Sequence, residues 1–233
     1  MKRTLKLFLL VAIIATSTTL ASAQKAGKPF SGTIKFTLSY DGVEASQLAQ
    51  MPTSQTIYIS GNKQKTVLDL GQYAMYTITD GDAESFIFFV DAMGQKFAYR
   101  MDKATIAKEK ADDKSPKPKV TLSDETKEIA GVKCKKATMV AKDEETGDES
   151  TTIVWYTNEL GTNDKLNFMG ENEGITGIVL GSETKVKAIT RKSYATEIKK
   201  GKVKDLEFLI PEEAKEMTKE EFMKMFGGGG EEE

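Results

Sequence analysis

The chain has 233 residues, with 33 basic and 35 acidic side chains, one cysteine and no histidine. The missing histidine excludes Ser-His-Asp and Cys-His nucleophile systems and imidazole-bound metal centres, and we expect neither a metal nor a cofactor. The net charge of −2 argues against nucleic acid as a partner held by bulk charge, and the lone cysteine excludes an internal disulfide.

The first 23 residues have the form of a secretory signal peptide. Basic residues precede the apolar stretch 7–15, which is too short to span a bilayer, and Ala21-Ser22-Ala23 fits a cleavage site. An uncleaved membrane anchor is the alternative. We therefore expect a periplasmic or secreted protein whose mature chain begins at Gln24 and has no transmembrane segment.

Residues 24–226 predict a single β-rich domain, and residues 227–233 predict a flexible acidic tail. A chain of this length buries about 70% of its unfolded surface around one core. The stretch 102–119 is rich in Lys and Asp and breaks the β pattern, although both of its flanks favour strands. We interpret it as an exposed excursion with a frayed helical turn, and a basic docking site is the alternative.

Strands with a period of two dominate the first half of the chain. Apolar and polar residues alternate from Phe30 to Tyr40, and glycine-containing turns separate the runs that follow. Short turns without long intervening helices predict an antiparallel meander. Between Val43 and Met51 we expect a short helix or a covering loop. The expected strands are 30–40, 55–60, 63–70, 73–79, 85–91 and 96–101.

A long antiparallel hairpin is predicted from Lys133 to Thr157, with its turn at 143–148. After it we expect a helical turn at 163–169, an apolar run at 175–180, and strands at 185–198 and 203–210.

Pro211 is placed to stop the last strand and to begin a helix. Further on, Thr218-x-x-Glu221 is a capping box, and Phe222 and Phe226 would share one face of its helix.

Three motifs in the C-terminal half carry a family resemblance. They are Ile129-Ala130-Gly131-Val132-Lys133-Cys134, Val154-Trp155-Tyr156-Thr157 and Glu207-Phe208-Leu209-Ile210-Pro211. They resemble an uncharacterised family of exported bacterial proteins known as domain of unknown function four-four-one-two. The similarity is weak before Asp102, and Val132 replaces the usual aromatic residue. The family-motif residues are Gly131, Cys134, Trp155 and Pro211.

The strand order of that family is similar to that of the LolA and LolB lipoprotein carriers. This resemblance implies a mainly β fold, a strongly curved antiparallel sheet or incomplete barrel with one to three short helices plugging its concave side. It also implies an apolar ligand in the cavity, such as a lipid or lipoprotein, although a shared fold does not by itself establish function.

Aromatic side chains are the candidates for lining such a cavity. Trp155 and Tyr156 point to opposite faces of their strand, so at least one should face the core or the cavity, and a plain packing role is preferred to cavity lining. The ligand-cavity candidates are Phe36, Phe86, Phe88, Phe97, Trp155, Phe222 and Phe226.

Other reactive residue types have simpler interpretations. Cys134 lies among valines and is expected to be a buried packing residue, with a redox or cross-linking thiol as the alternative. The acidic turns 80–84 and 143–149 lack the spacing of a calcium loop. Met217, Met223 and Met225 could offer thioether ligands to copper, but we expect them to pack against the core from an amphipathic helix.

Two functions from different classes follow. The first is a non-catalytic exported carrier that binds a lipid or a lipidated segment in the concave face of a curved sheet. The alternative is an envelope structural or interaction protein with a packed interior and no ligand. An enzyme is the third interpretation and is not expected, because the sequence offers no nucleophile–base pair and no metal-ligand set.

Overall fold

The computed structural model describes residues 29–71, 73–92, 94–112, 116–142, 147–168 and 174–226. These residues are mainly β, and their strands form one twelve-stranded sheet that does not close. The expected signal peptide at 1–23, the tail at 227–233 and the turn residues 143–146 lie outside the described part. No helix of the described part is long and apolar enough to cross a membrane.

The first six strands form an antiparallel meander, as predicted from the alternating pattern. The turn between the second and third strands uses Gly61 at a φ of 58°, which suits a two-residue hairpin turn. These strands are β1 (Ser31–Asp41), β2 (Ser54–Ser60), β3 (Lys63–Asp69), β4 (Tyr73–Asp80), β5 (Ser85–Ala92) and β6 (Gln95–Met101).

A second meander contains the predicted central hairpin, which the structure confirms. Its first turn places Ala130 and Gly131 at φ values of 50° and 77°, the positive pair that a type I′ turn requires. Gly131 thus has a conformational role in its motif. The strands are β7 (Lys119–Ile129), β8 (Val132–Lys142), β9 (Glu149–Thr157), β10 (Ile178–Val186) and β11 (Ile189–Lys200).

The prediction of a single strand at 185–198 was wrong. β10 ends at Val186 and β11 begins at Ile189, because the chain reverses at Lys187 with a φ of 53°. This turn contains no Gly, Pro, Asn or Asp, the residue types by which turns are recognised in sequence.

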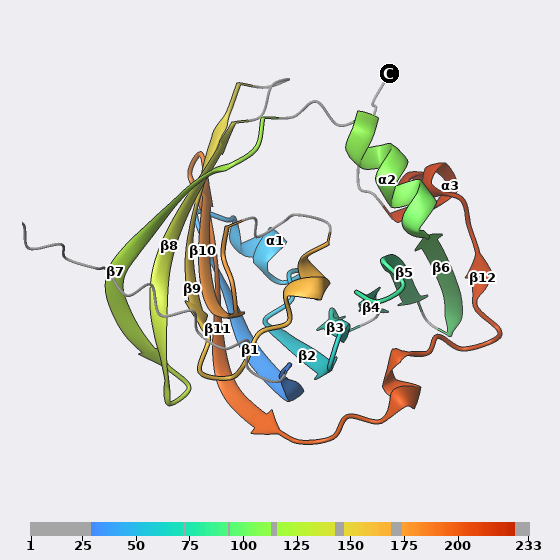
Figure 1. Ribbon diagram of the computed structural model, residues 1–233. Coiled ribbons are helices and arrows are strands. Elements are labelled where there is room, and N and C mark those ends of the chain that lie inside the picture. The colour runs from blue at the N-terminus through green and yellow to red at the C-terminus, as the bar shows by residue number, and fades with distance from the viewer. Residues whose placement is uncertain are drawn as a thin grey trace, which may run out of the picture.

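β1 pairs antiparallel with β11 from Gly32 opposite Lys200 to Asp41 opposite Thr190, and this seam joins the two meanders. The strand order is β12-β6-β5-β4-β3-β2-β1-β11-β10-β9-β8-β7, in which β12 is the short strand Lys215–Glu216. The sheet bends along this order, and one of its faces is concave (Figure 1).

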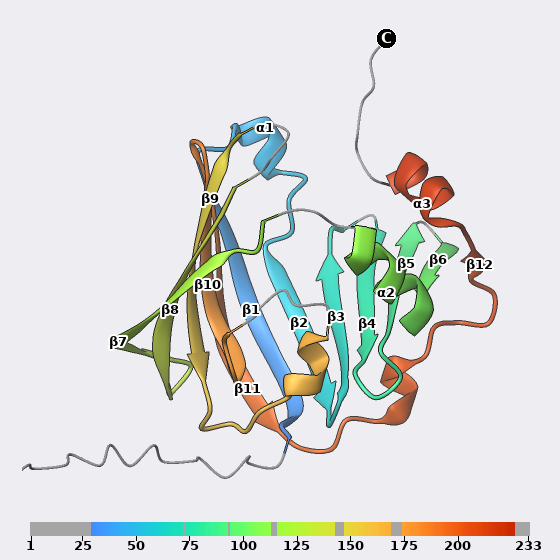
Figure 2. The same cartoon turned by 45° about the horizontal axis from the view of Figure 1, so that its top comes forward.

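Helical segments lie on the concave side in the middle of the sheet, as Figure 2 shows, whereas the 3₁₀ helix Asp205–Phe208 lies on the convex side. The stretch 43–51, expected to be a short helix or a covering loop, contains an α-helix, and the helical turn expected at 163–169 contains a 3₁₀ helix. The helices are α1 (Ala45–Leu48), α2 (Lys103–Asp112), η1 (Asp164–Asn167), η2 (Asp205–Phe208) and α3 (Lys219–Phe226).

The charged excursion is more ordered than predicted. α2 is a ten-residue helix, preceded by Asp102, whose carboxylate accepts a hydrogen bond from the Thr105 N–H at 2.8 Å. An acceptor at this position satisfies one of the free N–H groups of the first turn. The helix buries Ile106 against the sheet side of the molecule while its lysines remain exposed.

The C-terminal helix begins later than expected. Residues after Pro211 form a turn and then β12, which runs parallel to β6, so the helix predicted at Pro211 is absent. The capping box is confirmed: the Thr218 N–H donates to Glu221 Oε2 (2.9 Å), and the Glu221 N–H donates to Thr218 Oγ1 (3.2 Å).

The convex face of β2 to β5 is covered by the segment 201–211. Val203 and Phe208 are buried against Ile78, and Ile210 packs beside them. A strand was predicted at 203–210, and this was wrong: the segment is irregular and contains η2. Its apolar residues alternate because they cover a sheet, although they do not join one.

Candidate functional site

A cleft of about 530 Å³ lies on the concave face. Its floor is formed by β1 to β5, and residues 163–167 and 175–179 contribute a wall. Figure 2 shows η1 in front of these strands. The residues around it are Ile34, Gln55, Ile57, Ile59, Gln64, Thr66, Thr77, Thr79, Phe86, Phe88, Asn163, Asp164, Leu166, Asn167, Ile175, Gly177, Ile178 and Val179.

Strand register divides the floor into apolar and polar strips. One row across the strands runs from Phe88 through Thr77 and Thr66 to Ile57. The next row runs from Phe86 on β5 through Thr79 and Gln64 to Ile59. A polar strip on β3 and β4 therefore lies between aromatic side chains on β5 and aliphatic side chains on β2.

A second hollow of about 210 Å³ continues the cleft along β1, β10 and β11. The two share Gln55, Ile57 and Val179. Phe36 lines the second hollow, together with Ser182, Thr184, Arg191 and Ser193. The concave face thus offers one continuous amphipathic surface.

Asn163 fixes the wall to the floor. Its side-chain oxygen accepts a hydrogen bond from the Phe30 N–H (3.3 Å), and its amide group donates to the Phe30 carbonyl (3.4 Å) and to the Gly61 carbonyl. The amide is buried, so these bonds prevent the cost of an unpaired polar group. They hold Leu166 of η1 over the cleft.

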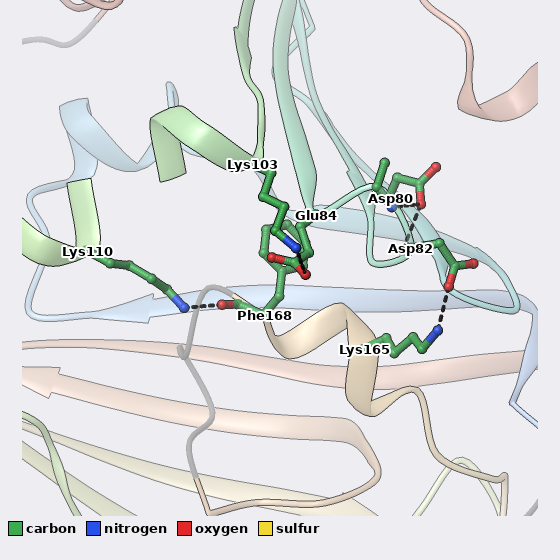
Figure 3. Close-up of polar contacts among 8 residues, drawn as sticks. Asp80, Asp82, Glu84, Lys103, Lys110, Lys165 and Phe168 are labelled. Carbon is green, nitrogen blue, oxygen red and sulfur yellow. Dashed lines mark hydrogen bonds and ion pairs between the residues drawn. The ribbon is translucent and has the colours of Figure 1, made fainter. Parts of the chain in front are cut away.

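Polar contacts link η1, α2 and the β4–β5 turn, as Figure 3 shows. Lys165 of η1 contacts Asp82 of the β4–β5 turn at 2.7 Å, and Lys103 of α2 contacts Glu84 at 2.9 Å. Lys110 of α2 also donates to the Phe168 carbonyl. Hydrogen bonds from Lys165 and Asn62 lower the pKa of Asp82. The acidic turn 80–84 therefore has lysine partners.

Three of the predicted aromatic residues line the hollows: Phe36, Phe86 and Phe88. Phe222 lies next to them, with its ring 5.1 Å from Phe88, so α3 closes one end of the cleft by packing. Phe97 points to the same face of the sheet as Phe88, because Phe97 and Tyr99 alternate along β6 and Tyr99 lies opposite Phe88, but Phe97 is not among the lining residues. The side chain of Phe226 lies outside the described part.

Trp155, a ligand-cavity candidate, is not among the residues that line the two hollows. Its neighbours Val154 and Tyr156 pack with Ile175 on the concave side, so Trp155 points to the opposite face of β9. There the Lys127 ammonium lies 5.5 Å from the Trp155 ring and 4.1 Å from the Tyr194 ring. Period-two alternation gave the opposite orientation of Trp155 and Tyr156 but did not indicate which face was concave.

Cys134 is free and buried in a core cluster with Ile129 and Leu180. Burial raises the pKa of its thiol to about 11, and the thiol donates weakly to the Val132 carbonyl. This is the expected environment of a packing cysteine, because the reactive thiolate form is disfavoured.

The described part contains no group of three His, Cys, Asp or Glu side chains arranged to hold a metal ion. Of the methionines near the C-terminus, Met217 is half-buried and Met225 is exposed, and the side chain of Met223 lies outside the described part.

Sequence reasoning missed the polar half of the cleft. Gln64, Thr66, Thr77 and Thr79 were not singled out, since uncharged polar residues at alternate positions are the ordinary mark of a solvent-facing strand surface. Arg191 was hidden inside the strand that was predicted as continuous.

No known family model matches the chain, and no curated protein matches it.

Proposed function

We propose that this protein is a non-catalytic carrier that holds an amphipathic molecule, a lipid or a lipidated segment, in its concave cleft. The observation that carries the proposal is the cleft itself. Its volume of about 530 Å³ falls in the range of small-molecule sites, which are concave, mostly apolar and oriented by a few polar groups.

The lining indicates the kind of ligand. Ile57, Ile178 and Phe88 supply apolar contact area, and each buried methylene group of a chain contributes about 0.8 kcal/mol. The polar strip on β3 and β4 favours a ligand that also forms hydrogen bonds, since polar groups covered without partners cost free energy. An amphipathic molecule satisfies both surfaces.

The proposal includes a LolA-type fold and a periplasmic or secreted location. The open, bent sheet with helices on its concave side supports the first. The leader-like residues 1–23 and the motif residues Gly131, Cys134, Trp155 and Pro211 support the second through the family they resemble.

A test places a bulky side chain in the cleft. Thr66→Phe fills the floor between Thr77 and Ile57, whereas Thr37→Phe adds the same side chain to the exposed opposite face of β1. Binding of the neutral dye N-phenyl-1-naphthylamine is followed by fluorescence, because Trp155 is on the wrong face to report it. We expect Thr66→Phe to weaken dye binding at least tenfold and Thr37→Phe to leave it unchanged.

Native mass spectrometry of the purified protein provides a second readout, in which a co-purifying lipid adds mass. The proposal fails if the wild-type protein binds neither dye nor lipid, or if both variants weaken binding equally. A dye-free protein with a reproducible cross-linked protein partner would instead support the envelope interaction function.

A further inference from the structure

The two hollows carry opposite charges at opposite ends. Among the described residues, Asp164 is the one charged residue lining the larger hollow, and Arg191 is the one charged residue lining the smaller. Their positions along β1 are known from two contacts. Asn163, next to Asp164, forms a hydrogen bond with the Phe30 N–H at the start of β1, whereas Arg191 lies opposite Tyr40 near the end of β1. Ten residues of extended chain separate Phe30 from Tyr40, which is about 33 Å.

Arg191 is available to a ligand. No ion pair or hydrogen bond joins its guanidinium to another side chain of the described part, whereas the next residue, Lys192, contacts Asp41 at 2.6 Å on the other face of the strand. Arginine remains charged at all physiological pH values and binds carboxylate or phosphate through paired N–H groups.

Hydroxyl groups surround Arg191 on the concave face. Thr184 lies opposite it on β10, and the next cross-strand pair on this face is Ser182 with Ser193. Ser193 is 8% exposed, so this hydroxyl faces the interior of the hollow. Apolar contacts begin directly beyond these residues, at Phe36 and Val179.

We propose that the cleft selects an anionic single-chain amphiphile and fixes its direction, with the acidic head group on Arg191 and the chain extending toward Phe88. This inference rests on the proposed binding of an amphipathic molecule. Asp164 at the opposite end disfavours the reverse orientation, because like charges repel. The shared chemistry of the head group is a carboxylate or phosphate monoanion.

The test compares three sixteen-carbon ligands: hexadecanoate, hexadecyl phosphate and neutral hexadecan-1-ol. Each displaces N-phenyl-1-naphthylamine from the wild-type protein, from Arg191→Gln and from Lys192→Gln, below the micelle concentrations. The Lys192 variant removes a positive charge one residue away, on the opposite face. Circular dichroism and the unfolding midpoint establish that the variants are folded.

We expect at least one anion to bind the wild-type protein about five- to tenfold more tightly than the alcohol, as a partly exposed charge-assisted contact provides. Arg191→Gln should abolish this preference while leaving the affinity for the alcohol unchanged, and Lys192→Gln should retain it. Comparison of the two anions then assigns the head group.

Two negative results are distinguishable. If the alcohol binds and Arg191→Gln leaves the affinity for both anions unchanged, this inference is overturned and the proposed function stands. If the wild-type protein binds neither the dye nor any of the three ligands, the proposed function fails as well.

Discussion

Glu197 is an exposed carboxylate whose pKa is strongly lowered by two lysines. It lies between Lys199 (2.6 Å) and Lys35 (2.9 Å), on neighbouring strands of the seam between β1 and β11. A hydrogen bond from Lys199, and to a smaller extent one from Lys35, lowers its pKa from 4.5 to about 2. The carboxylate is solvent-exposed, so its contribution to stability is screened by salt.

The sign of this shift gives a pH prediction. A lowered pKa in the folded state stabilises the protein fully above pH 4.5, and this stabilisation is lost as the pH falls through that value toward about 2. The difference in stability between the wild type and Glu197→Gln should therefore shrink over this window at low salt. Urea unfolding midpoints measure it, with exposed Glu212→Gln as the control, and a constant difference down to pH 2 contradicts it.

Cys134 should be unreactive in the folded protein. Its pKa of about 11, compared with an ordinary value of 9.0, reduces the thiolate fraction at pH 8 about a hundredfold, and burial blocks access as well. Alkylation by iodoacetamide should be at least about a hundred times slower in buffer than in urea. Rates within tenfold of each other would show that the thiol is accessible.

At the scale of elements, Gly181 marks a close approach between strands. A Cβ atom at this position would lie 2.8 Å from the Tyr194 ring and 3.0 Å from Ile129 Cδ1. Both contacts are shorter than side-chain packing allows without movement, and Tyr194 is also held by its hydroxyl bond to Glu183. A glycine is required at this position because Ile129 of β7 and Tyr194 of β11 leave no space for a Cβ atom on β10.

We expect Gly181→Ala to lower the free energy of unfolding by about 1–2 kcal/mol. Overpacking costs about 1–3 kcal/mol, and the reduced entropy of the unfolded chain returns less than 1 kcal/mol. Gly201→Ala is the matched control, because a Cβ there meets no atom within 4 Å. Thermal or urea unfolding measures both variants, and equal effects would exclude overpacking at Gly181.

The elements that were predicted correctly have local causes. The strands of the first meander follow from alternation and glycine turns, and α3 begins where Thr218 and Glu221 cap it. The elements that were missed depend on distant contacts. The segment 203–210 alternates because it covers Ile78, and the break at Lys187 follows from pairing on both sides of the turn.

The cleft was predicted only in outline. Phe36, Phe86 and Phe88 follow from the preference of aromatic residues for hollows, but the concave face and the convex face both bury apolar side chains. Alternation separates two faces without saying which is hollow. The curvature that decides this comes from the whole sheet, so the sequence alone could not determine whether Trp155 or Tyr156 faces the hollow.

At the scale of the whole molecule, the two meanders should unfold together. The seam between β1 and β11 pairs ten residues of β1, and one core cluster contains Ile34 and Ile59 from the first meander with Cys134 and Ile178 from the second. A shared core makes separate unfolding of either half costly, which favours a two-state transition.

Two tryptophan reporters test this cooperativity. Trp155 reports on the second meander in the wild type, and Phe88→Trp in a Trp155→Phe background reports on the first. In each of the two proteins, the urea midpoint from tryptophan fluorescence should coincide with the midpoint from far-ultraviolet circular dichroism. A fluorescence transition that departs from the dichroism curve of its own variant would reveal independent units.

The position of β1 also governs the order in which the chain is able to assemble. β1 precedes the other described strands along the chain but lies in the middle of the sheet, and its second neighbour ends only at Lys200. On the ribosome, or during any passage that releases the N-terminal end first, the first meander emerges with one side of β1 unsatisfied. A polypeptide that has not yet been extended through β11 therefore displays an unpaired strand edge, and a helper that shields such edges would act during this interval.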